Sequence, residues 1–399
     1  MRPPLPAGPY LVVGMARSGV SALRALRTLG ERAVGVDSGR PSVDLPDVYL
    51  DNDGLDLLDA AQAVVKSPGV PAEAPVVAAA RERGLTVLGE LELAWRLLPN
   101  AFIAVTGTNG KTTTAELIGH VHREAGVPVE VAGNVGTALT SLVGAVDPAA
   151  VVVCEASSFQ LEDTLEFAPD AAVLLNVEPD HLDRHGTLER YRAAKLQAFA
   201  RQGPEDLAVS ELDVPGRARR VNPLDVSGWE LGVRGAHNAA NAGFAAAVCL
   251  ERGLGEEAVR AGLRTFRGVE HRLEEVATRD GVLYVNDSKA TNVASTLMAI
   301  AAFSAPVHLI LGGQGKGQDF APLREAVAGA SVYLIGEDGL AIGEAIDTGV
   351  WCEDLEGAVV AARAAARQGD VVLLSPACAS FDQHADFEAR GRRFKELVA

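Results

Sequence analysis

Short apolar runs alternate with alanine- and leucine-rich stretches along the whole chain, and this alternation limits the possible folds more than any other feature. The apolar runs include YLVVG, AFIAVTG, AVVVCEAS, AAVLLNV, VHLILGG and VVLLSP. Runs this apolar are typical of strands buried on both faces, which happens where helices cover a parallel sheet. The sequence therefore predicts an α/β fold built from parallel sheets.

Two breaks divide this pattern. With 399 residues the chain is too long for one ordinary core, so several domains are expected. One break lies in RLLPNAF, around Pro99, and the other lies in FRGVEHRLE, around Gly268. They predict three α/β domains, over residues 1–98, 99–268 and 269–399.

The charge of the chain excludes some classes of partner. A formal net charge of −17 argues against a nucleic-acid-binding protein, which needs a basic surface. No stretch reaches the roughly 18 unbroken apolar residues of a membrane-spanning helix. The first residues also lack the apolar run and cleavage site of a secretory signal. We therefore expect a cytoplasmic protein that binds no nucleic acid and does not insert into a membrane.

The strongest local pattern is AFIAVTGTNGKTTTAELIGHV, in which an apolar run leads through a glycine turn into a helical stretch. Glycines let backbone N–H groups face phosphate oxygens, and the helix N-terminus adds partial positive charge. The turn matches a shortened phosphate loop, because Val105 stands where the first glycine is usual. Lys111 is expected to reach the β- and γ-phosphates, and Thr112 to hold Mg²⁺. The residues expected to bind the nucleotide are Gly107, Thr108, Asn109, Gly110, Lys111, Thr112 and Thr113.

Carboxylate and imidazole side chains follow the next two apolar runs. Glu155 follows the apolar residues of AVVVCEAS, and Asp180 and His181 follow AAVLLNV. Parallel strands bring their carboxyl ends to one edge of a sheet, so these residues are expected beside the phosphate loop. Glu155 is a candidate ligand of the nucleotide's Mg²⁺. His181 is a candidate ligand of a second divalent ion, although Mg²⁺ prefers oxygen.

A lysine stands on the apolar side of the next predicted helix. Only six of the 36 basic residues are lysines, and a helix capped by Thr187 would place Lys195 on one stripe with Tyr191 and Phe199. Burial and nearby cations would both favour a neutral amine. A neutral amine can bind CO₂ as a carbamate, an anionic oxygen ligand, whereas an arginine cannot. The alternative is a lysine whose ammonium group reaches water, and the local sequence does not decide between them.

The N-terminal domain begins with a strand, a glycine turn and a helix, as dinucleotide-binding folds do. The turn reads Gly14-x-Ala16-x-x-Gly19, and Asp37 ends the next apolar run. The middle glycine of the usual turn lets a pyrophosphate approach the backbone. Ala16 at that position therefore weakens an interpretation as an NAD-binding domain.

The motifs together resemble those of the Mur ligases, the ATP-dependent enzymes that build the peptidoglycan stem peptide. The central motifs are TGTNGKTT, EASSFQLE, NVEPDHLDRH and YRAAKLQAF. Towards the C-terminus the likeness continues in GAHNAANAGFAA, EHRLE, NDSKATNVAST, LGGQGKGQDF and LLSPACASFDQHADFEARG, and VVGMARSGVSALR and VKSPGV fit at the N-terminus. NDSKATN and SPACASFD are similar to those of the members that add D-glutamate. The resemblance implies a Rossmann-like N-terminal domain, a P-loop-type central ATPase domain and a Rossmann-like C-terminal domain.

The resemblance also implies a role for each motif. Lys195 would be the family's carbamylated lysine, so the cofactors would be ATP, two Mg²⁺ ions and CO₂. The catalytic residues would be Lys111, His181 and Lys195, and the metal ligands Thr112, Glu155, His181 and Lys195. Further nucleotide contacts would be Asn238, Asn241, Arg272 and Asp287. The UDP-substrate contacts would be Gly14, Met15, Ala16, Arg17, Ser18, Asp37, Gly69, Asn134 and His181. The D-glutamate contacts would be Lys289, Thr291, Lys316, Ser380 and Phe387.

The implied activity is ATP-dependent joining of D-glutamate to UDP-N-acetylmuramoyl-L-alanine, through an acyl phosphate, in peptidoglycan biosynthesis. We also expect a monomer, with hinge closure near residue 268 that keeps water from the acyl phosphate. Two alternatives stay open. One is another Mur-type or polyglutamate-type amide ligase. The other, from a different class, is an NAD-dependent oxidoreductase or a P-loop switch protein.

Overall fold

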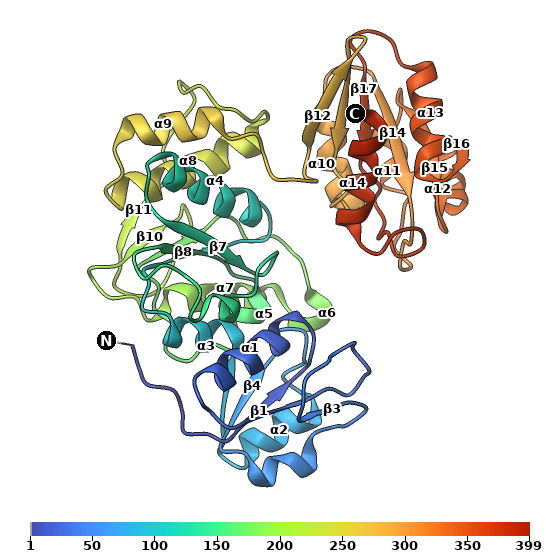
Figure 1. Ribbon diagram of the computed structural model, residues 1–399. Helices are drawn as coiled ribbons and strands as arrows, with labels where there is room; N and C mark the ends of the chain where they lie inside the picture. Colours follow the sequence, from blue (N-terminus) through green and yellow to red (C-terminus); the bar gives the residue numbers. More distant parts are fainter. Residues whose placement is uncertain (1) are drawn as a thin grey trace. The chain divides into compact units, whose positions relative to one another are not determined.

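The computed structural model describes residues 2–399, except for the side chain of Asp183. The strands of this part of the chain form three sheets, and helices flank each of them (Figure 1). Every apolar run named above forms a strand whose residues are almost all buried. The predicted α/β fold with Rossmann-like parallel sheets is therefore confirmed.

The first sheet has the strand order β3-β2-β1-β4-β5, and all its strands are parallel. This order, with the first strand at the centre, is that of a Rossmann-like sheet. The strands are β1 (Tyr10–Val13), β2 (Ala33–Val36), β3 (Val48–Tyr49), β4 (Ala63–Lys66) and β5 (Thr86–Gly89). The helices are α1 (Arg17–Thr28), the 3₁₀ helix η1 (Leu55–Ala60), α2 (Pro75–Glu82) and α3 (Glu90–Leu97).

The second sheet has the order β11-β10-β9-β6-β8-β7, again parallel. Its strands are β6 (Phe102–Thr106), β7 (Val129–Gly133), β8 (Val151–Glu155), β9 (Ala171–Leu174), β10 (Leu207–Val209) and β11 (Arg219–Val221). Its helices are α4 (Lys111–Glu124), η2 (Leu139–Leu142), α5 (Ser158–Leu161), α6 (Leu182–His185), α7 (Leu188–Ala200), α8 (Ala236–Glu251) and α9 (Glu256–Thr265). Helices α4, α8 and α9 cover one face, and α5 and α7 cover the other (Figure 1).

The third sheet has the order β12-β13-β17-β14-β15-β16. Its strands are β12 (Glu274–Arg279), β13 (Val282–Asn286), β14 (Val307–Gly312), β15 (Ser331–Ile335), β16 (Val350–Glu353) and β17 (Val371–Leu374). Its helices are α10 (Val293–Ala301), α11 (Leu323–Ala326), α12 (Gly339–Ile346), α13 (Leu355–Ala365) and α14 (Phe387–Val398). The expectation of parallel pairing is wrong for β12, which runs antiparallel to β13. The polar sequence of β12 suits an edge strand with one face in water.

Helix α3 joins the first two sheets because it is apolar on two sides. Leu91 and Trp95 belong to the core of the second sheet, together with Phe102. Leu93 belongs to the core of the first sheet, and Leu97 packs against it. Residues 1–231 and 236–266 accordingly form one compact unit, and residues 232–235 and 267–399 form another. The division into three domains stays a prediction.

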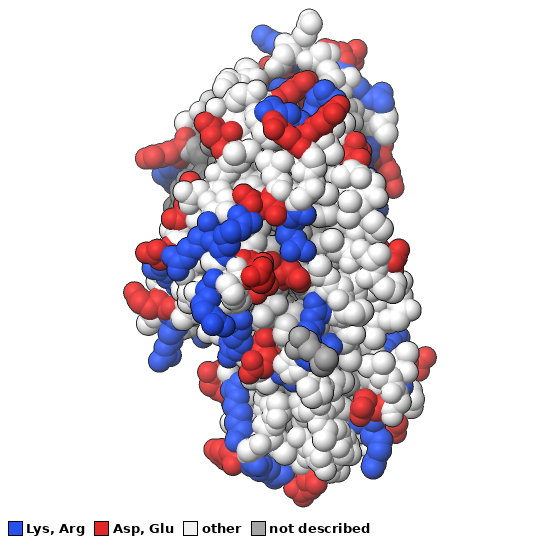
Figure 2. All heavy atoms as spheres, turned by 90° about the vertical axis from the view of Figure 1, so that its left-hand side faces the viewer, with Lys and Arg blue, Asp and Glu red and all other residues white. Residues whose placement is uncertain are grey.

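In the part of the chain that the structure describes, every helix is too short or too polar to cross a bilayer. Figure 2 shows one face of the molecule, on which lysine and arginine side chains are interspersed with carboxylates.

Glu90, at the start of α3, is a carboxylate inside the first compact unit. It is 1% exposed, and its Oε1 accepts hydrogen bonds from the N–H and the hydroxyl of Thr140, at 2.7 and 2.8 Å. Its Oε2 is buried without a hydrogen-bond partner among the described residues. Burial raises the pKa of Glu90 above its ordinary value, although the two bonds from Thr140 lower it.

We predict that the wild type loses stability at higher pH as Glu90 loses its proton, and that Glu90→Gln does not show this loss. The folded state binds the Glu90 proton more tightly than the unfolded state does. The stability from this proton is therefore present below the unfolded pKa and lost as the pH rises through the folded pKa. Thermal unfolding from about pH 4.5, near the ordinary carboxyl pKa, up to about pH 8 should show the variant gaining stability relative to the wild type as the pH rises. Parallel curves for the two proteins would contradict the prediction.

Candidate active site

The phosphate loop leaves β6 and ends in the first turn of α4. Gly107 has a φ of 156°, and a Cβ there would lie 2.9 Å from Leu175 Cβ. Gly110 has a φ of 83°, and its Cβ would lie 2.4 Å from Asn241 Oδ1. Both positions therefore require glycine. The predicted strand, glycine turn and helix are all present, with Val105 buried in the strand.

Asn176, which the sequence alone does not single out, holds this loop in place. Its Oδ1 accepts hydrogen bonds from the N–H groups of Thr108 and Asn109, at 3.0 and 2.9 Å. Its Nδ2 donates to the Asn109 carbonyl oxygen at 3.2 Å. The Asn109 side chain in turn donates to the Glu178 carboxylate at 3.0 Å. Asn176 follows β9, and it reaches the loop because β9 pairs with β6.

Two lysine side chains converge on one carbonyl oxygen of the loop. Lys111 Nζ donates to the carbonyl oxygens of Gly107 and Thr108, at 3.0 and 2.8 Å. Lys195 Nζ donates to the same Gly107 oxygen at 2.7 Å. Lys195 is 1% exposed, so the alternative of an ammonium group in water is wrong. Its helix starts as predicted, with the Thr187 side chain accepting a hydrogen bond from the backbone N–H three residues on.

Burial changes the protonation of Lys195. Desolvation, helped by the charge of Lys111, lowers the pKa of Lys195 to about 7. A substantial fraction of the amine is therefore neutral near neutral pH, as the sequence analysis expects. A neutral amine is the form that can bond to CO₂.

The Tyr191 ring lies next to Lys195, His181 and His185. Lys195 Nζ lies 4.4 Å from the centroid of the Tyr191 ring, and the rings of His181 and His185 lie 6.3 and 5.3 Å from it. The Tyr191 hydroxyl lies 3.2 Å from the Thr108 hydroxyl of the phosphate loop. The structure therefore brings His181 and Lys195 to one ring beside the loop. The sequence had placed Tyr191 only on an apolar stripe.

Glu155 lies on the other side of the phosphate loop. It ends β8 and pairs with Val105 of β6, as the sequence predicts for a carboxylate beside the loop. It is 3% exposed, and its Oε1 accepts a hydrogen bond from Asn134 Nδ2 at 2.9 Å. The hydroxyl of Thr112 and the carboxylate of Glu155 are oxygen ligands of the kind that Mg²⁺ prefers. His181 and Lys195 offer nitrogen, which suits Mg²⁺ less well than oxygen does.

The glycine turn of the first sheet is held by Asp37. The Asp37 carboxylate accepts hydrogen bonds from the N–H groups of Met15 and Gly39, at 2.6 and 2.8 Å. A Cβ on Gly19 would lie 1.8 Å from the Gly14 carbonyl oxygen, so this glycine permits close packing of α1 on β1. Ala16, Arg17 and Ser18, predicted as substrate contacts with Gly14 and Met15, follow in the turn and the start of α1.

The loops of the first sheet are tied to those of the second. Arg17 donates to the carbonyl oxygen of Gly136 at 2.9 Å, in the loop that carries Asn134. Arg184, which follows His181 in the chain, donates to the carbonyl oxygen of Val70 at 3.1 Å, beside Gly69. These two hydrogen bonds therefore join loops of both sheets that carry predicted substrate contacts.

A buried ion pair supports the same junction. Lys66 is fully buried, and its Nζ lies 2.7 Å from Asp163 Oδ2 and donates to the Val70 carbonyl oxygen at 2.7 Å. The contact with Asp163 is an ion pair by distance, although its angle is not that of a hydrogen bond. Burial raises the pKa of Asp163 more than Lys66 lowers it. The sequence did not point to this pair, because its members lie far apart in the chain.

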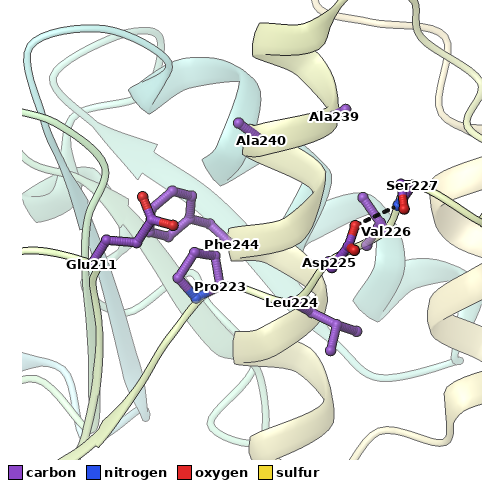
Figure 3. Close-up of a pocket in the computed structure, with 9 residues that line it drawn as sticks. All are labelled: Glu211, Pro223, Leu224, Asp225, Val226, Ser227, Ala239, Ala240 and Phe244. Atoms are coloured by element: carbon purple, nitrogen blue, oxygen red, sulfur yellow. Dashed lines mark hydrogen bonds between the residues drawn. The ribbon is translucent and has the colours of Figure 1, made fainter.

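Helix α8 carries the two asparagines predicted as nucleotide contacts. Asn241 is 7% exposed and abuts Gly110 of the phosphate loop, and Asn238 lies one turn earlier. A pocket of about 300 Å³ opens beside the same helix, where Phe244 lies next to Pro223 and Glu211 (Figure 3). Its lining residues are Glu211, Pro223, Leu224, Asp225, Val226, Ser227, Ala239, Ala240 and Phe244. The sequence did not predict this pocket, because separate segments form it.

The second compact unit holds the other two predicted nucleotide contacts close together. Asp287 accepts hydrogen bonds from the Ser375 hydroxyl at 2.8 Å and from the Leu273 N–H at 3.2 Å. Burial raises the pKa of Asp287 to about 7, whereas the nearby charge of Arg272 lowers it.

The residues predicted to bind D-glutamate follow three neighbouring strands of the third sheet. Lys289 and Thr291 follow β13, Lys316 follows β14, and Ser380 and Phe387 follow β17. Lys289 Nζ lies 5.2 Å from the centroid of the Phe387 ring. The Ser380 hydroxyl is buried, and among the described residues it has no hydrogen-bond partner. Two ammonium groups and an unpaired hydroxyl suit a ligand that carries carboxylates.

Comparisons with known proteins show which family matches this chain. The Mur ligase middle domain matches residues 105–228, and the Mur ligase, glutamate ligase domain matches residues 271–378. A UDP-N-acetylmuramoylalanine–D-glutamate ligase of Pelotomaculum thermopropionicum is 40% identical, over 97% of this chain and 96% of that protein. The enzyme of the same name from Anaeromyxobacter dehalogenans is 42% identical, over 97% and 96%. The chain belongs to the Mur ligase family.

Solved structures share the fold of this Mur ligase. The MurF ligase of Thermotoga maritima, in complex with ADP, has a TM-score of 0.60 at 18% identity, over 98% of this chain and 94% of that chain. A bifunctional folylpolyglutamate synthase/dihydrofolate synthase of Yersinia pestis, complexed with AMPPNP and a Mn ion, has a TM-score of 0.57 at 18% identity. That likeness covers 77% of this chain and 91% of that chain.

We predict that Lys66→Met destabilises the protein by about 3–5 kcal/mol, because it leaves the buried Asp163 with only the half-exposed Arg81 as a partner, at 3.7 Å. Arg83→Met is the matched control. Arg83 also lies 2.7 Å from a carboxylate oxygen, that of Asp59, but their side chains are 44% and 82% exposed. Such an exposed pair is worth about 0–1 kcal/mol. Urea unfolding of the two variants measures the difference, and equal losses would show that burial of the Lys66 pair has no effect.

Proposed function

We propose that this Mur ligase joins D-glutamate to UDP-N-acetylmuramoyl-L-alanine in peptidoglycan biosynthesis, with conversion of ATP to ADP and phosphate. The observation that carries the proposal is the likeness to relatives that bear the name of this activity. They are 36–42% identical over 97–98% of the chain. The phosphate loop and the cluster around Lys195 supply groups that such a reaction needs.

The chemistry starts with activation of a carboxylate, which is a poor electrophile towards amines. The γ-phosphoryl group of ATP passes to the alanine carboxylate and gives an acyl phosphate. The amine of D-glutamate then attacks the carbonyl carbon and loses a proton, and phosphate leaves. Lys111 and the N–H groups of residues 107–113 would bind the phosphates, which offsets the repulsion between triphosphate and carboxylate.

Thr112 and Glu155 would hold the Mg²⁺ ion that accompanies ATP, and His181 and a carbamate on Lys195 would hold a second. When bound, Mg²⁺ supplies positive charge that stabilises the phosphoryl group in transfer. The ADP, AMPPNP and Mn bound to the two solved relatives support nucleotide and divalent metal at this fold. For Lys195, support comes from its burial and its lowered pKa of about 7.

The remaining contacts divide between the two compact units. The UDP-substrate would contact Gly14, Met15, Ala16, Arg17, Ser18, Asp37, Gly69, Asn134 and His181 of the first unit. The nucleotide would also contact Asn238 and Asn241 of the first unit, and Arg272 and Asp287 of the second. D-Glutamate would contact Lys289, Thr291, Lys316, Ser380 and Phe387 of the second. We further propose a cytoplasmic monomer.

The second candidate is another amide ligase of this architecture, because the fold is shared with a folylpolyglutamate synthase. An NAD-dependent oxidoreductase is disfavoured. Ala16 replaces the glycine that admits a pyrophosphate, and Asp37, the carboxylate that would bind a ribose, already accepts two backbone hydrogen bonds. A P-loop switch protein would have no use for the amino-acid pocket.

We predict that ADP is released from ATP and UDP-N-acetylmuramoyl-L-alanine only when D-glutamate is added. The assay scans D-glutamate, L-glutamate, L-alanine, lysine and diaminopimelate as acceptors. Reactions without the UDP-substrate serve as the control and should release none. Release with another acceptor, but not with D-glutamate, would favour the second candidate.

We predict that Lys195→Arg abolishes ligation, by at least about 100-fold, while the protein still folds. Arginine keeps the charge but cannot bind CO₂. Lys395→Arg is the matched control, since Lys395 pairs with Glu270 and Glu274 in a partly exposed position that arginine also suits. NMR with ¹³C-labelled CO₂ should detect a carbamate in the wild type and the control, but not in Lys195→Arg. A fully active Lys195→Arg enzyme would rule out the carbamate.

A further inference from the structure

The guanidinium group of Arg390 lies buried in the third sheet's unit, and none of the roles above uses it. Arg390 is the fourth residue of α14 and is 1% exposed. Its Nε donates to the Ser288 hydroxyl at 3.0 Å. Its Nη2 donates to the carbonyl oxygens of Ser288 and Cys378, both at 2.9 Å, and its Nη1 donates to that of Ala379 at 3.3 Å. All three guanidinium nitrogens therefore hold loop atoms.

Two of the loops that Arg390 holds carry residues of the proposed amino-acid pocket. Ser288 directly precedes Lys289 in the loop after β13. Cys378 and Ala379 directly precede Ser380 in the loop after β17. A single side chain thus bridges these two loops.

A third loop and the start of α14 join the same arrangement. The N–H of Gln314 donates to the Ala379 carbonyl oxygen at 2.9 Å, and the N–H of Ala379 donates to the Gln314 carbonyl oxygen at 3.0 Å. Gln314 lies two residues before Lys316. The Ser288 hydroxyl donates to the carbonyl oxygen of Phe387 at 2.8 Å. The loops with the proposed D-glutamate contacts are therefore all bonded, directly or through one residue, to Arg390.

The charge of Arg390 has no close counter-ion. Its acceptors are neutral oxygens, and among the described residues no carboxylate oxygen forms an ion pair with it within 4.0 Å. Burial lowers the pKa of Arg390 to about 10, so the group is still charged at neutral pH. The Asp382 carboxylate acts on Arg390 only from beyond ion-pair distance. A buried charge without a close partner is unfavourable, and an anion bound nearby relieves it. The unpaired hydroxyl of Ser380, one residue beyond Ala379, also points to a ligand at this place.

We propose that Arg390 is the positioning residue of the amino-acid pocket: it holds the loops of Lys289, Lys316 and Ser380 in the arrangement that binds the acceptor's carboxylate. The inference deepens the proposed function and rests on it, since it concerns the same acceptor site. An arginine that only stabilised the fold would not change the KM for the amino acid more than the KM for the other two substrates.

The test compares Arg390→Lys with Arg393→Lys. Lysine keeps the charge but lacks the planar fork that reaches both loops. Arg393 lies one turn further along α14, 43% exposed and paired with Glu356 and Glu396, so it controls for the same substitution on the same helix. For Arg390→Lys we expect the KM for D-glutamate to rise about tenfold or more, the effect of losing one or two hydrogen bonds. The KM for ATP and for the UDP-substrate should stay within about twofold, and Arg393→Lys should match the wild type.

Ser288→Ala gives a milder variant in case Arg390→Lys does not fold. It removes one of the four bonds of Arg390 and the bond from Ser288 to the Phe387 carbonyl, but it keeps the arginine, so a smaller rise in the same KM is expected. Hydrogen exchange of residues 287–291 and 376–380 should be faster in both variants than in Arg393→Lys. This measurement does not depend on ligation, so it tests the positioning role whichever amino acid is the acceptor. If the acceptor is not D-glutamate, the KM for the actual acceptor is measured instead.

Three results would overturn the proposal. One is an unchanged KM for the acceptor in both variants. Another is an equal rise for all three substrates, which is what a merely structural role predicts. The third is loop exchange in the Arg390 and Ser288 variants that is no faster than in Arg393→Lys.

Discussion

The carbonyl oxygen of Gly107 accepts hydrogen bonds from both Lys111 and Lys195, and the proposed chemistry depends on this shared contact. Two ammonium groups at one carbonyl oxygen repel each other, and the buried Lys195 is not solvated. Lys195 is the more buried of the two, and desolvation together with the charge of Lys111 lowers its pKa to about 7. A lysine in this state is suited to a role as a neutral amine or, after reaction with CO₂, as an anion.

The order of strands in the second sheet creates this contact. Strand β6 lies between β8 and β9, so the phosphate loop receives Glu155 from one neighbour and Asn176 from the other. Helix α7 packs against β6 and β9 and places Lys195 and Tyr191 beside the phosphate loop. The first sheet is held against this assembly by the two-sided helix α3 and by the buried Lys66–Asp163 pair. The loops proposed to bind the UDP-substrate are therefore built on two sheets but held as one unit.

Much of this could be predicted from local sequence. Apolar runs identified the buried strands, because their length and composition reflect burial on both faces. The cap at Thr187 and the stripe through Lys195 identified the inward face of α7. The antiparallel strand β12 was not expected, since its polar sequence resembles a loop as much as an edge strand. Asn176 and Arg390 were also not found. One lies in a loop without periodicity, and the other stands beside Arg392 and Arg393 in a run that reads as a charged surface.

By itself, the sequence determined which segments become strands and helices, where the phosphate loop lies, and which lysine faces inward, since spacing and composition encode these locally. Only the tertiary structure decided what Lys195 contacts, because the Gly107 oxygen is 88 residues away and reaches it through strand pairing. Tertiary structure alone also decided that Lys66 meets Asp163 and that Arg390 joins the loops of the amino-acid pocket. Hydrogen bonds and ion pairs between distant segments depend on how the sheets and helices pack, and no local pattern records that packing.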